Sequence, residues 1–316
     1  LFEDEINQHP NKEQYTKDFA SSVQKVYEFF FNKILNKLID NNFSKNVVYA
    51  GGCALNSSAN RLLTNDKINF SKIYIPFAPG DNGGALGSAF VVANKLNNIL
   101  KNVKTPYLGK SFKDKYIKEV LESSIYKNKL IYNFIEDENK FLRQAATFIS
   151  NGNVIGWFQG KMEFGPRALG NRSILADPRN PQMKKIINMK IKRRESFRPF
   201  APSILQEFQT DWFESDFNNP YMSSLATVKK DKRGIIPAVT HFDNTARLQT
   251  VSKETNLKFS NLLKHFYKLT GVPILLNTSF NENEPIVMKP EEALDCILRT
   301  NMDAIFINNF FITKKI

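Results

Sequence analysis

The sequence predicts an α/β fold, and three observations support this. In the first hundred residues an apolar stretch of strand length, a glycine-rich turn and a helical segment follow one another twice, at 46–63 and at 72–96. Later, the apolar runs at 154–158 and 272–276 have the length of buried strands. Each of these runs ends in a glycine or polar turn, as in α/β sheets that carry a ligand site at their strand ends.

The first hundred residues contain two glycine turns that can approach a ligand. Apolar residues at helical spacing predict the first helix, and Gly51 and Gly52 end the first strand. Backbone N–H groups in such turns can meet phosphate or adenosine, although close packing explains paired glycines equally well. The expected elements are helices at 15–40, 56–63 and 84–96 and strands at 46–50 and 72–76.

Asp81 lies in the second glycine-rich turn, just ahead of a helix. A carboxylate in this place either caps the helix or ligates a metal beside a nucleotide. No paired histidines stand on one helix face to complete a metal site, because His9, His241 and His265 are scattered along the chain. Both interpretations of Asp81 stay open from the residues alone.

The second part of the chain begins after 98–115, where Thr-Pro and Gly-Lys pairs predict an interdomain connection. Residues 245–251 alternate, so that Thr245, Arg247 and Gln249 share one face, which fits an exposed sheet edge as well as a binding face. The elements expected here are helices at 113–126, 138–151, 257–269 and 290–300 and strands at 154–158, 222–228, 245–251, 272–276 and 304–311.

The segment 154–200 carries many basic residues, and its glycines force tight turns at the mouth of a strand. Arginine can bind two phosphate oxygens at once, and lysine adds a point charge. Residues 184–192 fit a solvated helix face. Arg167, Arg172 and Arg179 fit such a face poorly, because each stands beside glycine or proline and apolar residues. These three arginines therefore indicate an anion site.

Other polar residues near these turns have two interpretations. Asn277, Thr278 and Ser279 follow a buried strand, where they can bind a ligand or simply form a turn. Glu163 is expected to be a structural partner that orients the neighbouring arginines rather than an acid or base.

The amino-acid composition limits the possible binding partners only in part. The net charge of +13 favours anionic partners, but abundant Lys, Asn, Ile and Phe are also the signature of an AT-rich genome, so a nucleic-acid partner is not favoured. Cys53 and Cys296 lack metal-ligand spacing. No apolar run approaches the ~20 residues that span a bilayer, and no signal peptide is evident. These features predict a cytoplasmic protein with no membrane partner.

Five stretches taken in order resemble the O-carbamoyltransferases of the nodulation and antibiotic-tailoring type. They are GGCALNSSANRLL, PFAPGDNGGALGSA, GWFQGKMEFGPRALGNRSILADPR, RPFAPSIL and NTSFNENEPIV. Members of that family pair an ASKHA-type domain with a C-terminal YrdC-like domain. The resemblance implies a partial ASKHA-type carbamoyl-transfer domain at 1–104, without its N-terminal part, and a YrdC-like domain with a twisted mixed sheet at 105–316.

The resemblance implies an ATP-dependent O-carbamoyltransferase. Carbamoyl phosphate and ATP, with Mg²⁺, would give carbamoyl-adenylate, and the carbamoyl group would pass to a hydroxyl of a small molecule or sugar. The residues implied for catalysis are Lys161, Arg167, Arg172 and Arg247. Those implied for nucleotide or carbamoyl binding are Gly51, Gly52, Asn56, Arg179, Arg198, Asn277, Thr278 and Ser279.

The resemblance also implies a metal, Fe(II) or a similar divalent ion, held by two histidines of an HxxxH motif and an aspartate. Asp81 matches the aspartate, whereas the histidine segment would lie upstream of Leu1. We therefore expect the metal only together with that upstream part.

Two other classes compete with this hypothesis. One is a tRNA-modification enzyme that makes threonylcarbamoyl-adenylate, and the other is a non-catalytic nucleotide-binding fragment. The order of the two modules on one chain favours the small-molecule carbamoyltransferase. A homodimer is allowed by the sequence, and the acceptor is not identified by it.

Overall fold

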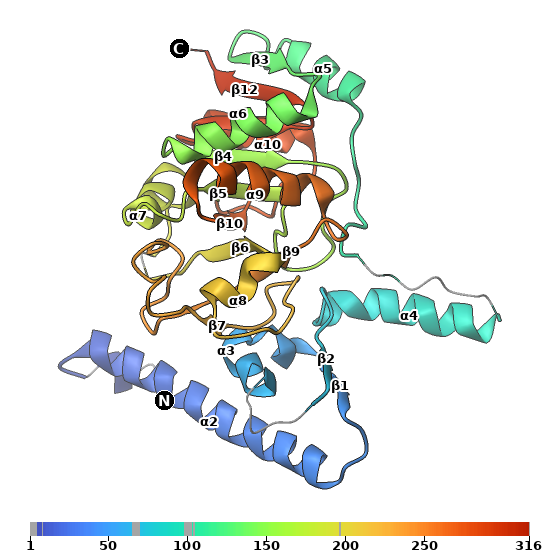
Figure 1. Ribbon diagram of the computed structural model, residues 1–316, viewed down its shortest axis with the longest axis vertical. Helices are drawn as coiled ribbons and strands as arrows, with labels where there is room; N and C mark the ends of the chain where they lie inside the picture. The colour runs from blue at the N-terminus through green and yellow to red at the C-terminus, as the bar shows by residue number, and fades with distance from the viewer. Residues whose placement is uncertain are drawn as a thin grey trace.

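The computed structural model describes residues 5–7, 9–64, 70–97, 103, 105–195 and 197–315. It is a mixed α/β structure built on one large mixed sheet, and a smaller N-terminal part carries two projecting helices (Figure 1). The predicted α/β class is confirmed. Of the predicted connection at 98–115, residues 98–102 and 104 lie outside the described part of the chain.

The N-terminal part is organised around a short parallel strand pair. In it β1 (Asn46–Val48) pairs with β2 (Lys72–Tyr74), with Val47 opposite Ile73. The long helix α2 (Lys12–Asp40) packs its buried Phe31 and Leu35 near this pair, and α4 (Asp81–Lys95) follows β2. Between the strands lie η1 (Gly52–Leu55), α3 (Ser57–Asn60) and η2 (Arg61–Thr64).

The predictions for this part are confirmed except at one segment. Both strands and the helices at 15–40 and 84–96 are present, although the strands are shorter. The single helix predicted at 56–63 is divided into a short α-helix, α3, and a 3₁₀-helix, η2. Ser and Asn favour caps and turns over helix interiors, and Asn56 accepts a capping bond from the backbone of Ala59 (3.1 Å).

The large sheet has eight strands in the order β3-β12-β11-β4-β5-β10-β6-β9. Neighbouring strands are antiparallel except at the β11–β4 and β6–β9 pairs. The strands are β3 (Leu130–Phe134), β4 (Ile155–Phe158), β5 (Arg172–Ala176), β6 (Ala201–Leu205), β9 (Gln249–Val251), β10 (Ile274–Ser279), β11 (Ala304–Ile307) and β12 (Phe310–Lys314).

Four helices cover the sheet, and one contiguous core lies beneath them. In Figure 1, α6 and α9 cross the sheet side by side, and these two helices contact each other. Helix α10 contacts β4 and β11, with α5 beside it. All four were predicted, and their bounds are α5 (Asp114–Glu122), α6 (Glu138–Ser150), α9 (Leu257–Thr270) and α10 (Pro290–Arg299).

Two strand predictions were wrong in detail. The alternating run at 245–251 is broken into β8 (Thr245–Ala246), which pairs with β7 (Ala226–Thr227), and β9, which pairs with β6. The closing strand at 304–311 is a tight hairpin of β11 and β12, with Asn308 at φ +47°. No strand was predicted at β3, β5 or β6, and at β5 the polar Arg172 and Ser173 hide the strand pattern.

The remaining short elements lie around the basic segment. They are α7 (Met183–Ile187), a turn of π-helix η3 (Asn188–Lys192), η4 (Gln206–Phe208) and α8 (Gln209–Trp212). Within the described residues, no helix has the length and apolarity needed to cross a bilayer.

Candidate active site

A loop at 159–171, which joins β4 to β5, carries the most specific motif of the chain. The buried carboxylate of Glu163 accepts backbone N–H bonds from Leu169 (2.7 Å), Asn171 (2.8 Å) and Arg172 (3.3 Å). Burial raises the pKa of Glu163, while these amides and the Arg172 charge oppose the shift. Glu163 thus holds the far end of the loop in place: the predicted structural role is confirmed, but it acts through backbone amides rather than by orienting arginine side chains.

A buried polar network ties the same loop to the sheet. Gln249 on β9 donates to the carbonyl of Leu169 (2.9 Å), and its own oxygen accepts from Ser203 (2.6 Å) and Asn277 (3.0 Å). Asn277 also reaches the carbonyl of Ala168 (3.3 Å). The side chain of Asn277 is therefore enclosed beneath the loop, so it supports the site instead of opening into it as expected for a ligand contact.

Arg172 has a supporting position that differs from the predicted phosphate contact. It is fully buried on β5, and its guanidinium lies 3.5 Å from the centre of the Phe158 ring. Both terminal nitrogens donate to carbonyls, those of Gln159, Asn171, Lys110 and Gly160 at 2.7–3.2 Å. Because these donors are already engaged, we assign Arg172 to positioning the loop.

Three other arginines make no salt bridge within the described residues, although the charge of Glu195 acts on one of them, Arg194. We call these three the arginine cluster: Arg167, Arg194 and Arg247. Burial lowers the pKa of Arg247 to about 9, and the charges of Arg167 and Arg194 lower it further. In the described part of the chain no carboxylate lies within salt-bridge distance of any of the three. Among the described residues, the buried Nε atoms of Arg194 and Arg247 have no hydrogen-bond partner, and neither has the Nε of Arg172. Such a cluster is suited to an anion.

Lys192 joins the cluster to the end of β10. Its ammonium donates to the backbone oxygens of Ser279 (2.6 Å) and Asn281 (2.8 Å) and to their side-chain oxygens. Burial and the nearby Arg194 lower its pKa to about 7. The sequence interpretation placed Lys192 on a solvated helix face, which is wrong, because the π-helical turn directs it inward.

Some of the predicted site residues lie near Lys192 and the arginine cluster, and others have partners elsewhere. Thr278 and Ser279 are half-buried at the end of β10, next to Lys192. Arg179 is instead paired with Asp177 (2.6 Å), and Arg198 with Glu195 (2.9 Å), so their charges are balanced locally. Lys161 is exposed on the loop.

Sequence reasoning missed two site residues. Arg194 was one of several basic residues in a run, and only its contact with the Phe200 ring (4.7 Å) and its unpaired Nε distinguish it. His241 has its Nδ1 beside the Thr245 hydroxyl (3.1 Å), which itself donates to Asp243 (2.7 Å). Burial, with Arg247 and Lys184 adding to it, lowers the pKa of His241 to about 4 against the opposing charge of Asp243.

The N-terminal candidates have local structural partners. Gly51 adopts φ +103°, where glycine is favoured, and donates to the carbonyl of Pro79 (2.7 Å); Gly52 opens η1. Asn56 caps α3 and exchanges side-chain bonds with Gln24 (2.9 Å). Asp81 is exposed at the start of α4, and the described residues contain no group of three metal-ligating side chains. The residues present therefore do not fit a metal centre.

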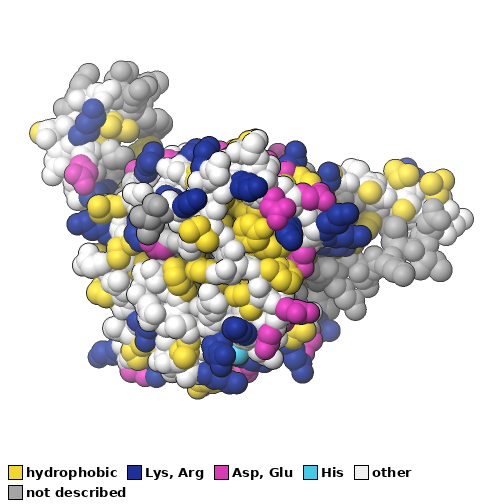
Figure 2. Space-filling view, turned by 90° about the horizontal axis from the view of Figure 1, so that it is seen from above, with side chains coloured by type: hydrophobic (Ala, Val, Ile, Leu, Met, Phe, Trp, Pro, Cys, Tyr) yellow, Lys and Arg dark blue, Asp and Glu magenta, His cyan; other side chains and the backbone are white. Residues whose placement is uncertain are grey.

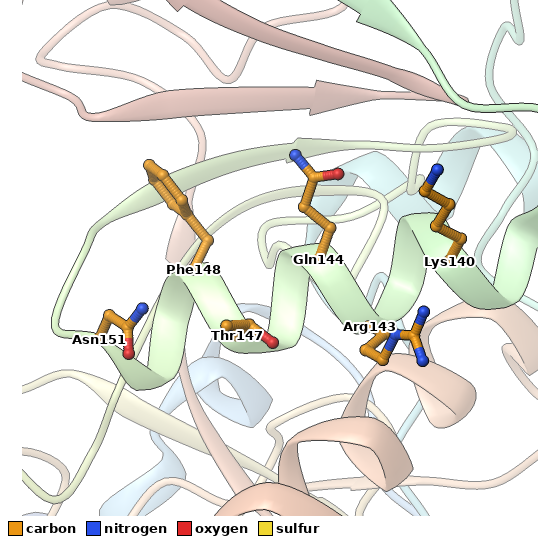
Figure 3. Close-up of a pocket in the computed structure, with 6 residues that line it drawn as sticks. All are labelled: Lys140, Arg143, Gln144, Thr147, Phe148 and Asn151. Carbon is orange, nitrogen blue, oxygen red and sulfur yellow. The ribbon is translucent and has the colours of Figure 1, made fainter.

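Not every surface pocket lies near the arginine cluster. Figure 3 shows one formed along a single helix, with the side chains of Lys140, Arg143, Gln144, Thr147, Phe148 and Asn151 from α6 and its end. A cavity of about 380 Å³ lies instead between Arg61 and Thr64 on one side and 214–216 and Thr245 on the other. Thr245 is two residues from Arg247. The cavity thus lies where the N-terminal part meets the strand that precedes the cluster.

The comparisons with known proteins match these features to one family. A family model described as the carbamoyltransferase C-terminus matches residues 146–314, which include every residue of the arginine cluster. The chain belongs to the carbamoyltransferase family. A second model, the carbamoyltransferase N-terminus, matches residues 1–90. The recognition of the family from its motifs is confirmed.

Relatives of this carbamoyltransferase-family chain are considerably longer. An uncharacterised protein of Synechocystis is 42% identical, over 95% of this chain and 53% of its own length. Nodulation protein NolNO of Sinorhizobium fredii is 39% identical (96% and 45%), and nodulation protein NolO of Bradyrhizobium diazoefficiens 38% (96% and 55%). The chain thus spans about half the length of these relatives.

Solved structures are more distant from this family member. Full-length HypF in its phosphate- and nucleotide-bound form matches with TM-score 0.37 and 15% identity, over 59% of this chain and 22% of HypF. Sua5 of P. abyssi matches with TM-score 0.37 and 13% identity, over 55% and 49%. Likeness at this level adds nothing to the fold described above.

Proposed function

We propose that this chain forms carbamoyl-adenylate from carbamoyl phosphate and ATP, for transfer of the carbamoyl group to a hydroxyl of a small molecule or sugar. The observation that carries the proposal is the arginine cluster: the charges of Arg167 and Arg194 act on the buried Arg247, and none of the three makes a salt bridge within the described part of the chain. Like charges held together and partly buried are costly unless an anion joins them. Two polyanionic substrates supply such charge.

The proposed chemistry balances in two steps. Carbamoyl phosphate and water give carbamate and inorganic phosphate, as the bond between the carbamoyl carbon and the phosphate oxygen breaks. A carbamate oxygen then attacks the α-phosphorus of ATP, and the bond to the pyrophosphate oxygen breaks. Both steps move negative charge onto phosphate oxygens, where fixed guanidinium donors stabilise it.

The side chains divide between contact and support in this proposal. Arg167, Arg194 and Arg247 bind phosphate oxygens, and Lys161 at the exposed edge of the loop adds charge as substrate arrives. Thr278 and Ser279 offer hydroxyls at the strand end. Five other residues position the loop at 159–171 and the strand ends through hydrogen bonds: Glu163, Arg172, Lys192, Gln249 and Asn277.

Mg²⁺ would enter with ATP, because it prefers phosphate and water oxygens to a protein cage. It would neutralise charge on the phosphates when bound. The single exposed carboxylate of Asp81 supports no transfer step through a metal. Gly51, Gly52 and Asn56 remain our candidates for adenosine binding in a transfer domain at 1–104, with the adenylate-forming domain at 105–316.

Pyrophosphate release tests the proposal. The chain is incubated with ATP and Mg²⁺, with either carbamoyl phosphate or threonine plus bicarbonate. We expect release with carbamoyl phosphate only, and Arg167→Ala should lower its rate by about 100-fold or more. Arg198→Ala is the matched control, since that arginine is half-exposed and paired with Glu195; its rate should stay near that of the parent chain.

A second readout separates binding from folding. Pyrophosphate at about 100 times its Kd stabilises a protein by about 2.7 kcal/mol, so it should raise the Tm of the parent chain and not that of Arg167→Ala. Activity with threonine alone would instead assign the chain to threonylcarbamoyl-adenylate formation. Full turnover by Arg167→Ala would refute the role of the cluster.

A further inference from the structure

His241 is a partly buried histidine to which the proposed chemistry gives no role. It lies in the turn that precedes β8, where its backbone N–H donates to the carbonyl of Thr245 (2.8 Å). Positive charge alone does not mark this place, since Lys and Arg side chains are spread widely over the face seen in Figure 2. However, the chain continues from this turn to Arg247, whose charge acts on the imidazole. His241 therefore lies within electrostatic range of the arginine cluster.

A chain of hydrogen bonds fixes which ring nitrogen of His241 carries the proton. Burial opposes ionisation of Asp243, but bonds from Thr245 hold the pKa of this carboxyl below its ordinary value, so it is ionised at neutral pH and can only accept. The Thr245 hydroxyl donates its single proton to Asp243 (2.7 Å). Toward Nδ1 of His241 (3.1 Å) the same oxygen can only accept, which places the proton on Nδ1. In the neutral ring, Nε2 is then a bare acceptor.

This Nε2 atom is buried and has no hydrogen-bond partner among the residues that the structure describes. The ring is neutral at neutral pH, because burial and the charges of Arg247 and Lys184 lower its pKa to about 4 against the opposing charge of Asp243. Leaving an enclosed acceptor unpaired is costly. Nε2 thus requires a donor from a bound molecule.

The proposed substrates offer few hydrogen-bond donors to such an atom. Their ionised phosphate oxygens can only accept, so they suit the arginine cluster instead. The remaining groups that donate are the amino group of carbamoyl phosphate, the ribose hydroxyls and the adenine amino group. The carbamoyl amino group is the nearest of these to a phosphate, because only one carbon and one oxygen separate its nitrogen from phosphorus. A phosphate bound by Arg247 therefore favours the carbamoyl amino group as the partner of His241.

We infer that Nε2 of His241 accepts a hydrogen bond from the amino group of carbamoyl phosphate, and that this bond selects a carbamoyl group over an acetyl group. This role rests on the proposed function, which supplies the substrate. Acetyl phosphate has the same phosphate and carbonyl but a methyl group in place of the amino group, so it leaves Nε2 unpaired. Sites built to bond a substrate N–H strongly reject analogues that lack it. Thr245 and Asp243 are positioning residues, because they act through the imidazole.

Equilibrium titration of the full chain with carbamoyl phosphate and with acetyl phosphate tests this role without requiring turnover. We expect carbamoyl phosphate to bind about 100-fold more tightly or better, and His241→Phe to reduce this ratio at least about 10-fold by weakening carbamoyl phosphate alone. His265→Phe is the matched control. His265 is also partly buried, but the charges that act on it are those of Lys268 and Arg143 instead of the arginine cluster, so its loss should leave both affinities unchanged.

Nitrogen NMR of the imidazole gives a second readout that needs no substitution. In the parent chain at pH 7 we expect the proton on Nδ1 and a bare Nε2. The Nε2 resonance should shift when carbamoyl phosphate binds and stay in place with acetyl phosphate, because only the first supplies a donor. A histidine with a merely structural role would respond to both phosphates alike.

Two results would overturn the assignment of His241. One is a preference for carbamoyl phosphate that folded His241→Phe retains in full; if ATP binding weakens in that variant, the bond belongs to the nucleotide. The other is a proton on Nε2 in the parent chain. Pyrophosphate release is measured in parallel with both phosphates. A chain that discriminates through His241 yet releases no pyrophosphate refutes the proposed adenylate formation and leaves the recognition of the carbamoyl group intact.

Discussion

Arg167 and Arg172 stand five positions apart in one motif, yet they occupy opposite environments. Arg172 is surrounded by carbonyl oxygens that use its terminal donors. Burial lowers the pKa of Arg167, and no carboxylate in the described structure pairs with it. An arginine whose terminal nitrogens are engaged by the protein supports a fold, whereas one whose terminal nitrogens are free can bind substrate. The residue type alone does not separate these roles.

Glu284 anchors the loop beyond Asn281 and gives a test by pH. Burial alone would raise its pKa, but backbone N–H bonds and Arg299 (2.8 Å) outweigh burial and hold the pKa at about 2. The folded-state pKa is thus below the ordinary value of about 4.3, so its stabilisation is present above that value and is lost as the pH falls toward 2.

We therefore expect the free energy of unfolding to decline between about pH 4.5 and pH 2, and Glu284→Gln to make that decline shallower. Urea denaturation at a series of pH values measures it. An identical pH slope in the variant and the parent would contradict the assignment.

At the scale of elements, the loop at 159–171 depends on close approaches that only glycine allows. Gly170 has φ +101°, and a Cβ atom there would lie 2.2 Å from the ring of Phe259. We expect Gly170→Ala to destabilise the protein by about 2 kcal/mol or more, through backbone strain and overpacking. Denaturant titration measures the change.

Gly234→Ala is the matched control, because a Cβ atom there meets no heavy atom within 4 Å and its φ is not in the left-handed range. Its stability should stay within about 0.5 kcal/mol of the parent. Equal effects of the two substitutions would remove the argument for a constrained loop.

The break between β8 and β9 places Arg247 at the site. β8 pairs with β7 in a small sheet, and β9 pairs with β6 in the large one. Arg247 lies between the two strands, where its side chain is not committed to either sheet. Alternation in the sequence predicted one continuous strand here. A period of two shows which residues share a face, but it does not show which neighbouring strand each half of the segment pairs with.

At the scale of the whole molecule, two hydrophobic cores are separate. The small core around Phe31 and Leu63 belongs to the N-terminal part, and the large core lies under the eight-stranded sheet. Contacts between the parts include bonds from Asn60 to the carbonyl of Ser223 (2.7 Å) and from Leu225 to Ser57 (3.2 Å). We expect separate cores joined in this way to unfold as distinct cooperative units.

Calorimetry should therefore show two unfolding transitions, with the small core melting first because it buries far less apolar surface. Leu63→Ala should lower the first transition only, by about 2–5 kcal/mol at that core. A single transition that moves as one in the variant would contradict a division of the chain near residue 104.

The α/β class, the main helices, the glycine turns and the family could all be predicted from the sequence, because they follow from local periodicity, backbone freedom and motif. It also placed Glu163 as a support. Arg179 and Arg198 pair with carboxylates only two and three residues away, so those pairs are local. The enclosure of Arg172 by the carbonyl of Lys110 and the effect of the Arg167 charge on Arg247 depend instead on the folded structure, because these residues are far apart in the chain and no local pattern encodes their meeting.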